Sequence, residues 1–280
     1  MRGRLKAIFI GGGLAAAAAA LSPLLNHEQA NLTFLAVGQG DCTVFRTGGL
    51  TVLIDAGPAG EGFDAGKSII APELRRMGVQ VIDLILISHP DSDHIGGLPQ
   101  IAKRFRVGKV VAPAAFKGHQ ALLESYRSAG LSTTQIGWLS DRSSANLNGF
   151  ELTLDTPRLD AGERDNEGSM FVKVGQGESA VVFTGDANEE TELSMLGRGS
   201  WRGQILKAGH HGSRFSTSLP WLRAVRPQHV ILSCGRRNIY GHPAKDTLQR
   251  IGHARASAHR TDWDGHIRFS FRSGEWHLVR

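Results

Sequence analysis

The sequence is poor in cysteine, in aromatic residues and in long apolar runs. Its 280 residues include two cysteines, Cys42 and Cys234, which excludes a small disulfide-stapled protein and a cysteine-rich zinc module. Internal repeats and heptad patterns are missing too, which excludes solenoids and coiled coils. Beyond residue 30, no segment is long and apolar enough for a transmembrane helix. The remaining composition is that of a globular chain long enough for a substantial core.

The first 30 residues differ in composition from the rest. A basic start (residues 1–6) precedes an uncharged stretch, residues 7–25, that contains six consecutive alanines. This is the shape of an export signal, and its length also allows an uncleaved anchor. The glycine and alanine content makes it weakly hydrophobic, which favours a signal peptide. We therefore expect an exported protein, periplasmic or extracellular, with a signal peptide or N-terminal anchor at 1–30 and one domain at 31–280. Membrane contact is expected only through an uncleaved leader.

Charge is distributed unevenly along the chain. Residues 31–197 carry 14 Lys and Arg against 21 Asp and Glu, whereas residues 198–280 carry 15 against 4. A net charge of +11 in the last part favours polyanions such as nucleic acid, although an arginine-rich solvated surface explains it equally well. No dedicated DNA-reading motif is present, so sequence-specific recognition is not expected.

Short apolar runs alternate with turns from residue 32 onward. The first series predicts strands at 32–37, 41–46, 50–54, 82–88 and 109–112, and helices at 67–77, 97–105 and 119–129. The second predicts strands at 151–154, 169–174, 180–184, 204–208, 229–233, 267–271 and 276–279, and helices at 188–196, 217–225 and 244–251. This order predicts an α/β domain with two sheets packed face to face and helices outside.

The densest cluster of chemical groups follows the predicted strand 82–88. Two histidines and two aspartates, His89, Asp91, Asp93 and His94, fall within six residues before a Gly-Gly turn. Imidazole and carboxylate ligands suit zinc or manganese, and three or four of them leave a position open for water. A polar turn that caps the next helix is the alternative, but it does not require such a cluster.

Two later strand ends carry further candidate ligands. Asp186 follows strand 180–184, where one carboxylate can bridge two metal ions; alternatively, it caps the next helix. His210 and His211 follow strand 204–208. Adjacent imidazoles point in different directions, so one can ligate a metal while the other forms a hydrogen bond or meets substrate.

These motifs together resemble a known family. The His-x-Asp-x-Asp-His run at 89–94, Thr-Gly-Asp at 184–186 and His-His-Gly-Ser at 210–213 are similar to the metallo-β-lactamase superfamily. More narrowly, they resemble the hydrolase domain of ComEC-type DNA-internalization competence proteins, as do segments 37–41, 53–57, 238–243 and 260–262. The resemblance implies a four-layer αβ/βα sandwich of two mixed β-sheets flanked by helices.

The resemblance also implies one or two divalent ions, Zn²⁺ or Mn²⁺. The implied ligands are His89, Asp91, Asp93, His94, Asp186 and His210. In this scheme Asp186 bridges the ions, and His210 is favoured slightly over His211 because it is nearer the strand end. Asp91 stands where the superfamily usually has histidine, a departure shared with the ComEC-like group. The histidine expected between His94 and Asp186 has no candidate except His119, so either the first ion is weakly held or one ion suffices. An oxygen ligand in place of nitrogen favours manganese.

The remaining site residues follow from the same resemblance. Asp93 is the expected acceptor of the water proton, and His211 and His242 are candidates for contacting the phosphate or protonating the leaving oxygen. The expected substrate contacts are Ser213, Arg236, Arg237 and Asn238. Asp41 and Asp55 are expected to support the site through hydrogen bonds.

The function expected from these residues is metal-dependent hydrolysis by an exported phosphodiesterase or nuclease acting on DNA. The alternatives are a metallohydrolase of another ester, such as an envelope phosphodiester or a lactone, and a noncatalytic DNA-binding remnant. A remnant has no need of a buried anionic cluster, which is costly without a metal. Trp201, Trp221 and Trp263 could stack on bases, although packing is the commoner use of tryptophan. No protein partner is predicted.

Overall fold

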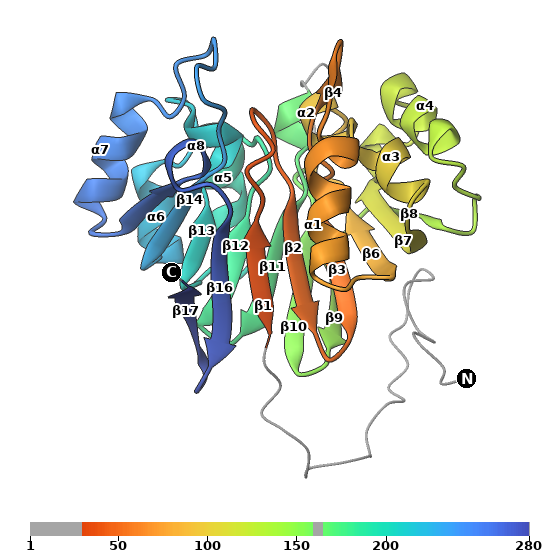
Figure 1. Ribbon diagram of the computed structural model, residues 1–280. Coiled ribbons are helices and arrows are strands. Elements are labelled where there is room, and N and C mark those ends of the chain that lie inside the picture. Colours follow the sequence, from red (N-terminus) through yellow and green to blue (C-terminus); the bar gives the residue numbers. More distant parts are fainter. Residues whose placement is uncertain (1–29, 159–164, 280) are drawn as a thin grey trace.

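The computed structural model describes residues 30–158 and 165–279, so the predicted leader, except for Ala30, lies outside the described residues (Figure 1). The strands are β1 (Asn31–Phe34), β2 (Thr43–Thr47), β3 (Leu50–Ile54), β4 (Ala59–Gly60), β5 (Phe63–Asp64), β6 (Val81–Leu86), β7 (Arg106–Pro113), β8 (Ile136–Leu139), β9 (Ser143–Leu147), β10 (Phe150–Asp155), β11 (Phe171–Gln176), β12 (Ser179–Phe183), β13 (Ile205–Lys207), β14 (His229–Leu232), β15 (Ser257–Arg260), β16 (Ile267–Arg272) and β17 (Glu275–Val279). The helices are α1 (Ala71–Arg76), α2 (Ser92–Ile95), α3 (Leu98–Ala102), α4 (Gln120–Ser128), α5 (Glu189–Leu196), α6 (Leu219–Val225), α7 (Lys245–His253) and α8 (Thr261–Asp264). Within the described residues, no helix has the length and hydropathy needed to cross a membrane.

The strands form two large mixed sheets and one small hairpin. The larger sheet has eight strands in the order β17-β16-β1-β2-β3-β6-β7-β8, and the other has seven in the order β15-β14-β13-β12-β11-β10-β9. Strands β3, β6, β7 and β8 run parallel in the first sheet, as do β12, β13, β14 and β15 in the second. Strands β4 and β5 form the separate hairpin, which rises above the upper edge of the larger sheet (Figure 1).

Three apolar clusters hold four layers together. The central cluster joins the inner faces of both sheets, with Phe34 and Phe45 from the larger sheet packed among Phe150 and Phe183 from the other. A second cluster lies between the larger sheet and α1, α3 and α4, and a third between the smaller sheet and α5, α6 and α7. The predicted αβ/βα sandwich of two mixed sheets flanked by helices is confirmed.

Several elements differ from those that the apolar pattern predicts. The predicted helix 67–77 begins as a wide turn at Gly66–Ile70 and continues as α1, and the predicted helix 97–105 is the short α3, preceded by α2. Strands β8, β9 and β15 and the β4–β5 hairpin were not expected. They are short or polar, so backbone pairing with neighbouring strands stabilises them more than an apolar face does.

The cysteines and two of the tryptophans are part of the core. Cys42 and Cys234 are both free and buried. Trp201 and Trp221 are buried against each other, with ring centroids 5.8 Å apart, so neither can stack on a base. Trp263, by contrast, is exposed, and the Arg260 guanidinium lies 3.7 Å from its ring centroid.

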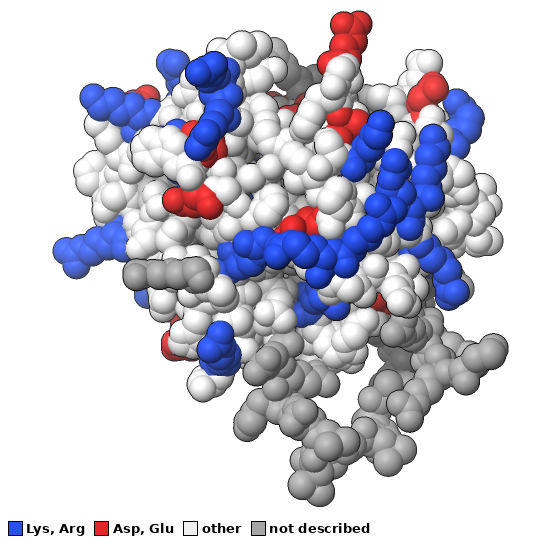
Figure 2. Space-filling model, in the orientation of Figure 1, with Lys and Arg blue, Asp and Glu red and all other residues white. Residues whose placement is uncertain are grey.

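Arginine side chains cover part of the outer face of the larger sheet. Figure 2 shows Lys and Arg gathered in a band across the face that carries α1 in Figure 1. Within this face, Arg46 of β2 donates to the Met77 carbonyl at the end of α1 (2.7 Å), and Arg268 of β16 donates to Glu73 of α1 (2.7 Å). Long arginine stems can shield apolar surface while the charged group stays in water, so this band also supports packing.

Candidate metal centre

The predicted site residues lie at the carboxyl ends of strands in both sheets. The larger sheet contributes Asp41 between β1 and β2, Asp55 after β3, and residues 89–94 after β6. The second sheet contributes Asp186 after β12 and residues 207–211 at the end of β13. Because the strands within each parallel group end at the same edge, and the sheets pack face to face, these segments converge.

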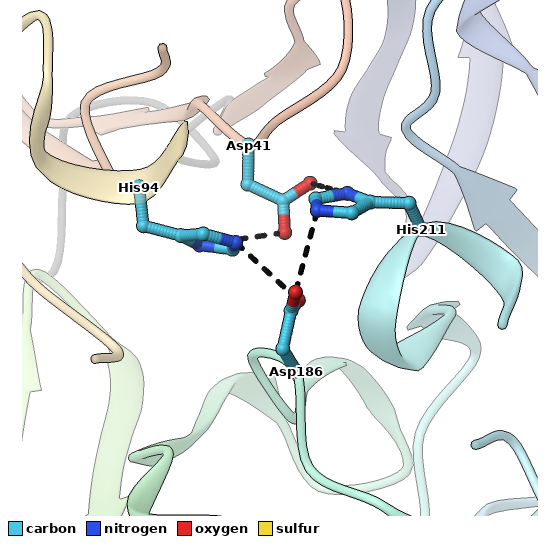
Figure 3. Close-up of side chains that lie close together, drawn as sticks. All are labelled: Asp41, His94, Asp186 and His211. Atoms are coloured by element: carbon cyan, nitrogen blue, oxygen red, sulfur yellow. Dashed lines mark ion pairs between the residues drawn. The ribbon is translucent and has the colours of Figure 1, made fainter. Parts of the chain in front are cut away.

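Four buried side chains converge most closely: Asp41, His94, Asp186 and His211 (Figure 3). One donor atom from each lies within 4.8 Å of the other three. His94 Nε2 is 3.3 Å from Asp186 Oδ1, and His211 Nε2 is 3.3 Å from Asp186 Oδ2. Asp186 therefore lies between the two histidines, where its carboxylate would be one of the groups to hold an ion.

The residues present fit a divalent metal ion. Two imidazoles and two carboxylates are a donor set that suits zinc or manganese. Several buried atoms in this region have no hydrogen-bond partner among the described residues: Asp41 Oδ1, His89 Nε2, His94 Nε2 and Asp186 Oδ1. Buried polar atoms are normally satisfied, so unpaired donors and acceptors gathered in one place indicate a ligand position. The identity and number of the ions remain a prediction.

Asp55 orients His94 from behind. Its Oδ2 atom lies 2.8 Å from His94 Nδ1, and the same carboxylate accepts hydrogen bonds from the Ser88 amide (2.8 Å) and hydroxyl (2.9 Å). A carboxylate on Nδ1 leaves Nε2 free to ligate and fixes the ring, as in the second layer of many metal sites. Asp55 thus occupies the place of the expected supporting residue.

The turn Gly209–Gly212 places His211, rather than His210, deepest in the site. Both histidines have left-handed backbone conformations, with φ of 47° and 55°, which is uncommon outside glycine and is often found at functional sites. His211 Nδ1 lies 3.0 Å from the Ser233 carbonyl, and its Nε2 lies 3.0 Å from Asp93 Oδ2. His210 Nε2 is 3.7 Å from Asp186 Oδ2, and its side chain is 35% exposed. His211 is therefore the better placed of the two for ligation.

Lys207 is a charged residue of the site that lies within the predicted strand 204–208. It is the last residue of β13, is buried, contacts Asp41 and has its Nζ 3.9 Å from Asp186 Oδ1. The sequence offers one sign of this role: a lysine stands within the apolar predicted strand 204–208, where a buried charge needs a partner. Lys207 supplies one fixed positive charge between two carboxylates of the cluster.

Mutual attraction shifts the pKa values within the cluster. Burial alone would raise the pKa of Asp186, but His211 and His94 outweigh it and hold that pKa well below its usual range. Burial alone would lower the pKa of His94, but Asp186 and Asp55 raise it well above 6.5. The pKa of Lys207 is likewise raised by Asp41 and Asp186 against the effect of burial. A divalent ion must therefore displace protons from the histidines, so its affinity falls as pH falls.

The remaining predicted ligands lie next to the cluster. His89 is buried with its ring centroid 4.1 Å from that of His94, and its Nε2 lies 3.5 Å from Asp91 Oδ2. Asp91 and Asp93 are partly exposed, which places their carboxylates at the mouth of the site. His119, the candidate for the missing histidine, instead lies 3.1 Å from Asp165 Oδ2.

The predicted substrate contacts divide between the surface and the interior. Arg236 and Arg237 are exposed, whereas Ser213 is buried with its hydroxyl near the Phe215 amide. Asn238 donates to the Gly235 and His242 carbonyls (2.9 and 2.7 Å), and so holds its own loop.

The His242 ring lies at the rim, with its centroid 5.7 Å from that of His210. Its pKa is lowered to about 4, chiefly by burial and then by His210 and His211. His242 is therefore neutral at pH 7, which suits a hydrogen-bonding group better than a fixed positive charge.

Curated relatives of this chain are competence and recombination proteins. It is 30% identical over 250 residues to "Competence protein ComA" of Neisseria gonorrhoeae, which covers 89% of this chain and 33% of the relative. It is 29% identical over 237 residues to "Recombination protein 2" of Haemophilus influenzae, covering 85% of this chain and 28% of the relative. It is 26% identical over 215 residues to "ComE operon protein 3" of Bacillus subtilis, covering 75% of this chain and 27% of the relative. The chain spans about a third or less of the length of these relatives, and the expected resemblance to competence proteins is confirmed.

Solved structures share the fold at low sequence identity. The diiron β-hydroxylase CmlA from Streptomyces venezuelae superposes with a TM-score of 0.59 at 19% identity, covering 88% of this chain and 55% of CmlA. The metallo-beta-lactamase fold protein YhfI from Bacillus subtilis superposes with a TM-score of 0.57 at 10% identity, covering 87% of this chain and 100% of YhfI. The family model of the metallo-beta-lactamase superfamily matches residues 35–236. The chain therefore belongs to the metallo-beta-lactamase superfamily, as a hydrolase-fold relative of competence proteins with a cluster of side chains able to hold a metal ion.

Proposed function

We propose that the protein is an exported, metal-dependent hydrolase that cleaves phosphodiester bonds of DNA without sequence specificity. The observation that carries this proposal is the cluster of Asp41, His94, Asp186 and His211 at the shared edge of both sheets. Its similarity to "Competence protein ComA" favours nucleic acid as the substrate. A divalent ion held at this site would supply Lewis-acid chemistry, activating water at neutral pH and neutralising charge on phosphoryl oxygens.

Asp93 is the proposed acceptor of the water proton. Its side chain is 29% exposed at the mouth of the cluster, and Oδ2 lies 3.0 Å from His211 Nε2. Although burial would raise its pKa, the contacts with His211 and His94 lower that pKa to about 2, so the carboxylate is ionised at pH 7. The same contact with His211 fixes its direction.

The rim supplies groups for the phosphate and the leaving oxygen. His242 is neutral and lies beside His210, where either ring can donate a hydrogen bond to a phosphoryl oxygen. Arg236 and Arg237 present guanidinium groups that bind phosphate well. Phosphate contacts position the chain of a nucleic acid but do not read its sequence, in keeping with cleavage at many sequences.

The proposal is tested by assaying the full chain on single- and double-stranded DNA with added Mn²⁺ or Zn²⁺, beside a generic phosphodiester and a lactone. Asp93→Ala should abolish DNA cleavage and leave DNA binding within about threefold, because the arginines of the rim are untouched. Asp246→Asn, at an exposed position of α7, is the matched control and should keep full activity.

Each of the other outcomes would assign a different function to the protein. Turnover of the small esters alone would replace DNA by another ester, such as an envelope phosphodiester or a lactone. DNA binding without metal uptake and without turnover would indicate the noncatalytic remnant. Cleavage that survives Asp93→Ala would show that the proton acceptor lies elsewhere.

A further inference from the structure

Three aromatic rings lead from the metal cluster to the surface. His210 Nε2 lies 3.7 Å from Asp186 Oδ2, and its ring centroid is 5.7 Å from that of His242. The His242 ring is in turn stacked on Tyr240, with centroids 5.8 Å apart and planes inclined by 27°. The outermost ring of this column is thus positioned through two histidines relative to the cluster.

Tyr240 is displayed rather than packed into the core. Its side chain belongs to the loop 235–243, and the residue is 65% exposed, as its neighbour Ile239 is at 90%. Asn238 holds the loop from within, through the two carbonyl contacts already described and by accepting from the His242 amide at 2.9 Å. The ring is therefore held on a braced loop and exposed to solvent, where a ligand can reach it.

The loop that carries this ring is positively charged. Arg236 and Arg237 precede it on the same loop, and the segment 235–243 contains no acidic residue. On the adjoining turn Arg214 is exposed, with its guanidinium 5.8 Å from the ring centroid of Phe215, which is itself 68% exposed. Exposed aromatic rings among arginines are the usual platform for unpaired bases of nucleic acids.

We propose that Tyr240 stacks on an unpaired base next to the cleaved phosphate, so that the preferred substrate is single-stranded nucleic acid or a single-stranded end. This inference rests on the proposed function and specifies its substrate. In a duplex both faces of each base are already stacked on neighbouring bases, so the ring can be used only where a base is unpaired or displaced. The His242 ring lies on one side of the Tyr240 ring, with centroids 5.8 Å apart, and we expect the base on the opposite side.

An anionic membrane surface is the main competitor for the same loop, because Ile239 and the arginines would also suit lipid headgroups. Nucleic acid is favoured because the ring column joins Tyr240 to the cluster. A membrane anchor has no need of that connection.

The test measures binding by fluorescence anisotropy with the full chain in the presence of a chelator, so that no turnover intervenes. The probes are a labelled 12-nucleotide single strand, the same strand with abasic sites in place of its bases, and the blunt duplex. Tyr240→Ala should weaken binding of the single strand by roughly 10-fold or more, within the range known for stacking of a base on an aromatic side chain. Tyr240→Phe keeps the ring and should stay within about twofold, and Ile239→Ser is the neighbouring control.

The abasic strand and the duplex provide the decisive contrast. For each of these two probes, the affinities of the wild type and of Tyr240→Ala should agree within about twofold. Equal weakening of all three probes, or no weakening of the single strand, would overturn the inference. Vesicles of phosphatidylcholine and phosphatidylglycerol that bind the wild type but not Tyr240→Ala, with unchanged single-strand binding, would assign the loop to membranes. Failure of the wild type to cleave any oligonucleotide with Mn²⁺ or Zn²⁺ would count against the proposed function instead, since the anisotropy measurement does not depend on turnover.

Discussion

Exchanging Lys207 for methionine tests whether its ammonium group balances the carboxylates of the metal cluster. Lys207 contacts Asp41 and lies 3.9 Å from Asp186 Oδ1, and the lysine and both aspartates are buried. Two unit charges about 4 Å apart attract by about 4 kcal/mol at an effective dielectric constant of about 20. The variant avoids the cost of burying an ammonium group but leaves two buried carboxylates without that positive charge, so the net loss should match that of a broken buried pair, about 3–5 kcal/mol.

The assay is urea unfolding at pH 7, first with a chelator and then with saturating Mn²⁺. In chelator, Lys207→Met should lower the free energy of unfolding by about 3–5 kcal/mol. Mn²⁺ should restore most of the loss, because a divalent cation supplies positive charge to the same carboxylates. The control Lys109→Met removes an exposed ammonium group bonded to the Thr134 carbonyl, and should change the free energy by about 0.5 kcal/mol or less.

Two results would refute this reasoning. A loss below about 1 kcal/mol in chelator would show that the buried carboxylates do not depend on Lys207 for their charge balance. A full loss that Mn²⁺ fails to restore would show that the ion and Lys207 do not act on the same carboxylates.

Two further predictions concern Glu192 and Asp55. Burial raises the pKa of Glu192 from 4.5 to about 7, although hydrogen bonds from the Thr217 and Ser218 amides to its carboxylate act in the opposite direction. The favourable contribution of Glu192 to the free energy of unfolding is therefore complete below pH 4.5 and is lost as pH rises to 7. Relative to Glu192→Gln, the wild type should lose about 3 kcal/mol of unfolding free energy over that interval; parallel urea-unfolding curves for the two proteins would contradict this. Asp55→Asn should weaken Mn²⁺ or Zn²⁺ binding by about 10- to 100-fold in a chelator-competition titration, because His94 loses its orienting carboxylate. A change below threefold, or an equal change in Asp246→Asn, would remove Asp55 from that role.

The sequence predicts the fold class and the strand ends that carry the site, but not every strand and not the arrangement of side chains within the site. His89, Asp93, His94 and Asp186 could be placed at the ends of buried strands because a continuous apolar run followed by polar residues is a strong local pattern. Their meeting at one edge then follows from the parallel pairing of strands. By contrast, β8, β9 and β15 have little apolar periodicity and form through pairing with strands distant in sequence, which no local pattern reports.

The arrangement within the site depended on backbone geometry that the sequence does not encode locally. Choosing between His210 and His211 by distance from the strand end ignores the two left-handed residues of the turn, which rotate His211 inward. Asp41 was expected only as a supporting residue, yet the connection from β1 to β2 brings it within reach of His94 and His211. Lys207 follows the apolar Ile205 and Leu206, so the local pattern predicts it as part of a strand and not as a residue of the site.

The metal cluster is shared between the two sheets, and this has a consequence for how the protein is assembled. Asp93 and His211, 118 positions apart in the chain, come from opposite halves of the sandwich. The complete donor set therefore exists only after both halves have formed and docked, so an ion should be captured late in folding. Once bound, the ion would hold the two sheets together, and its binding free energy would add to the stability of the docked halves. Scarcity of the ion would then weaken the union of the two halves of the sandwich.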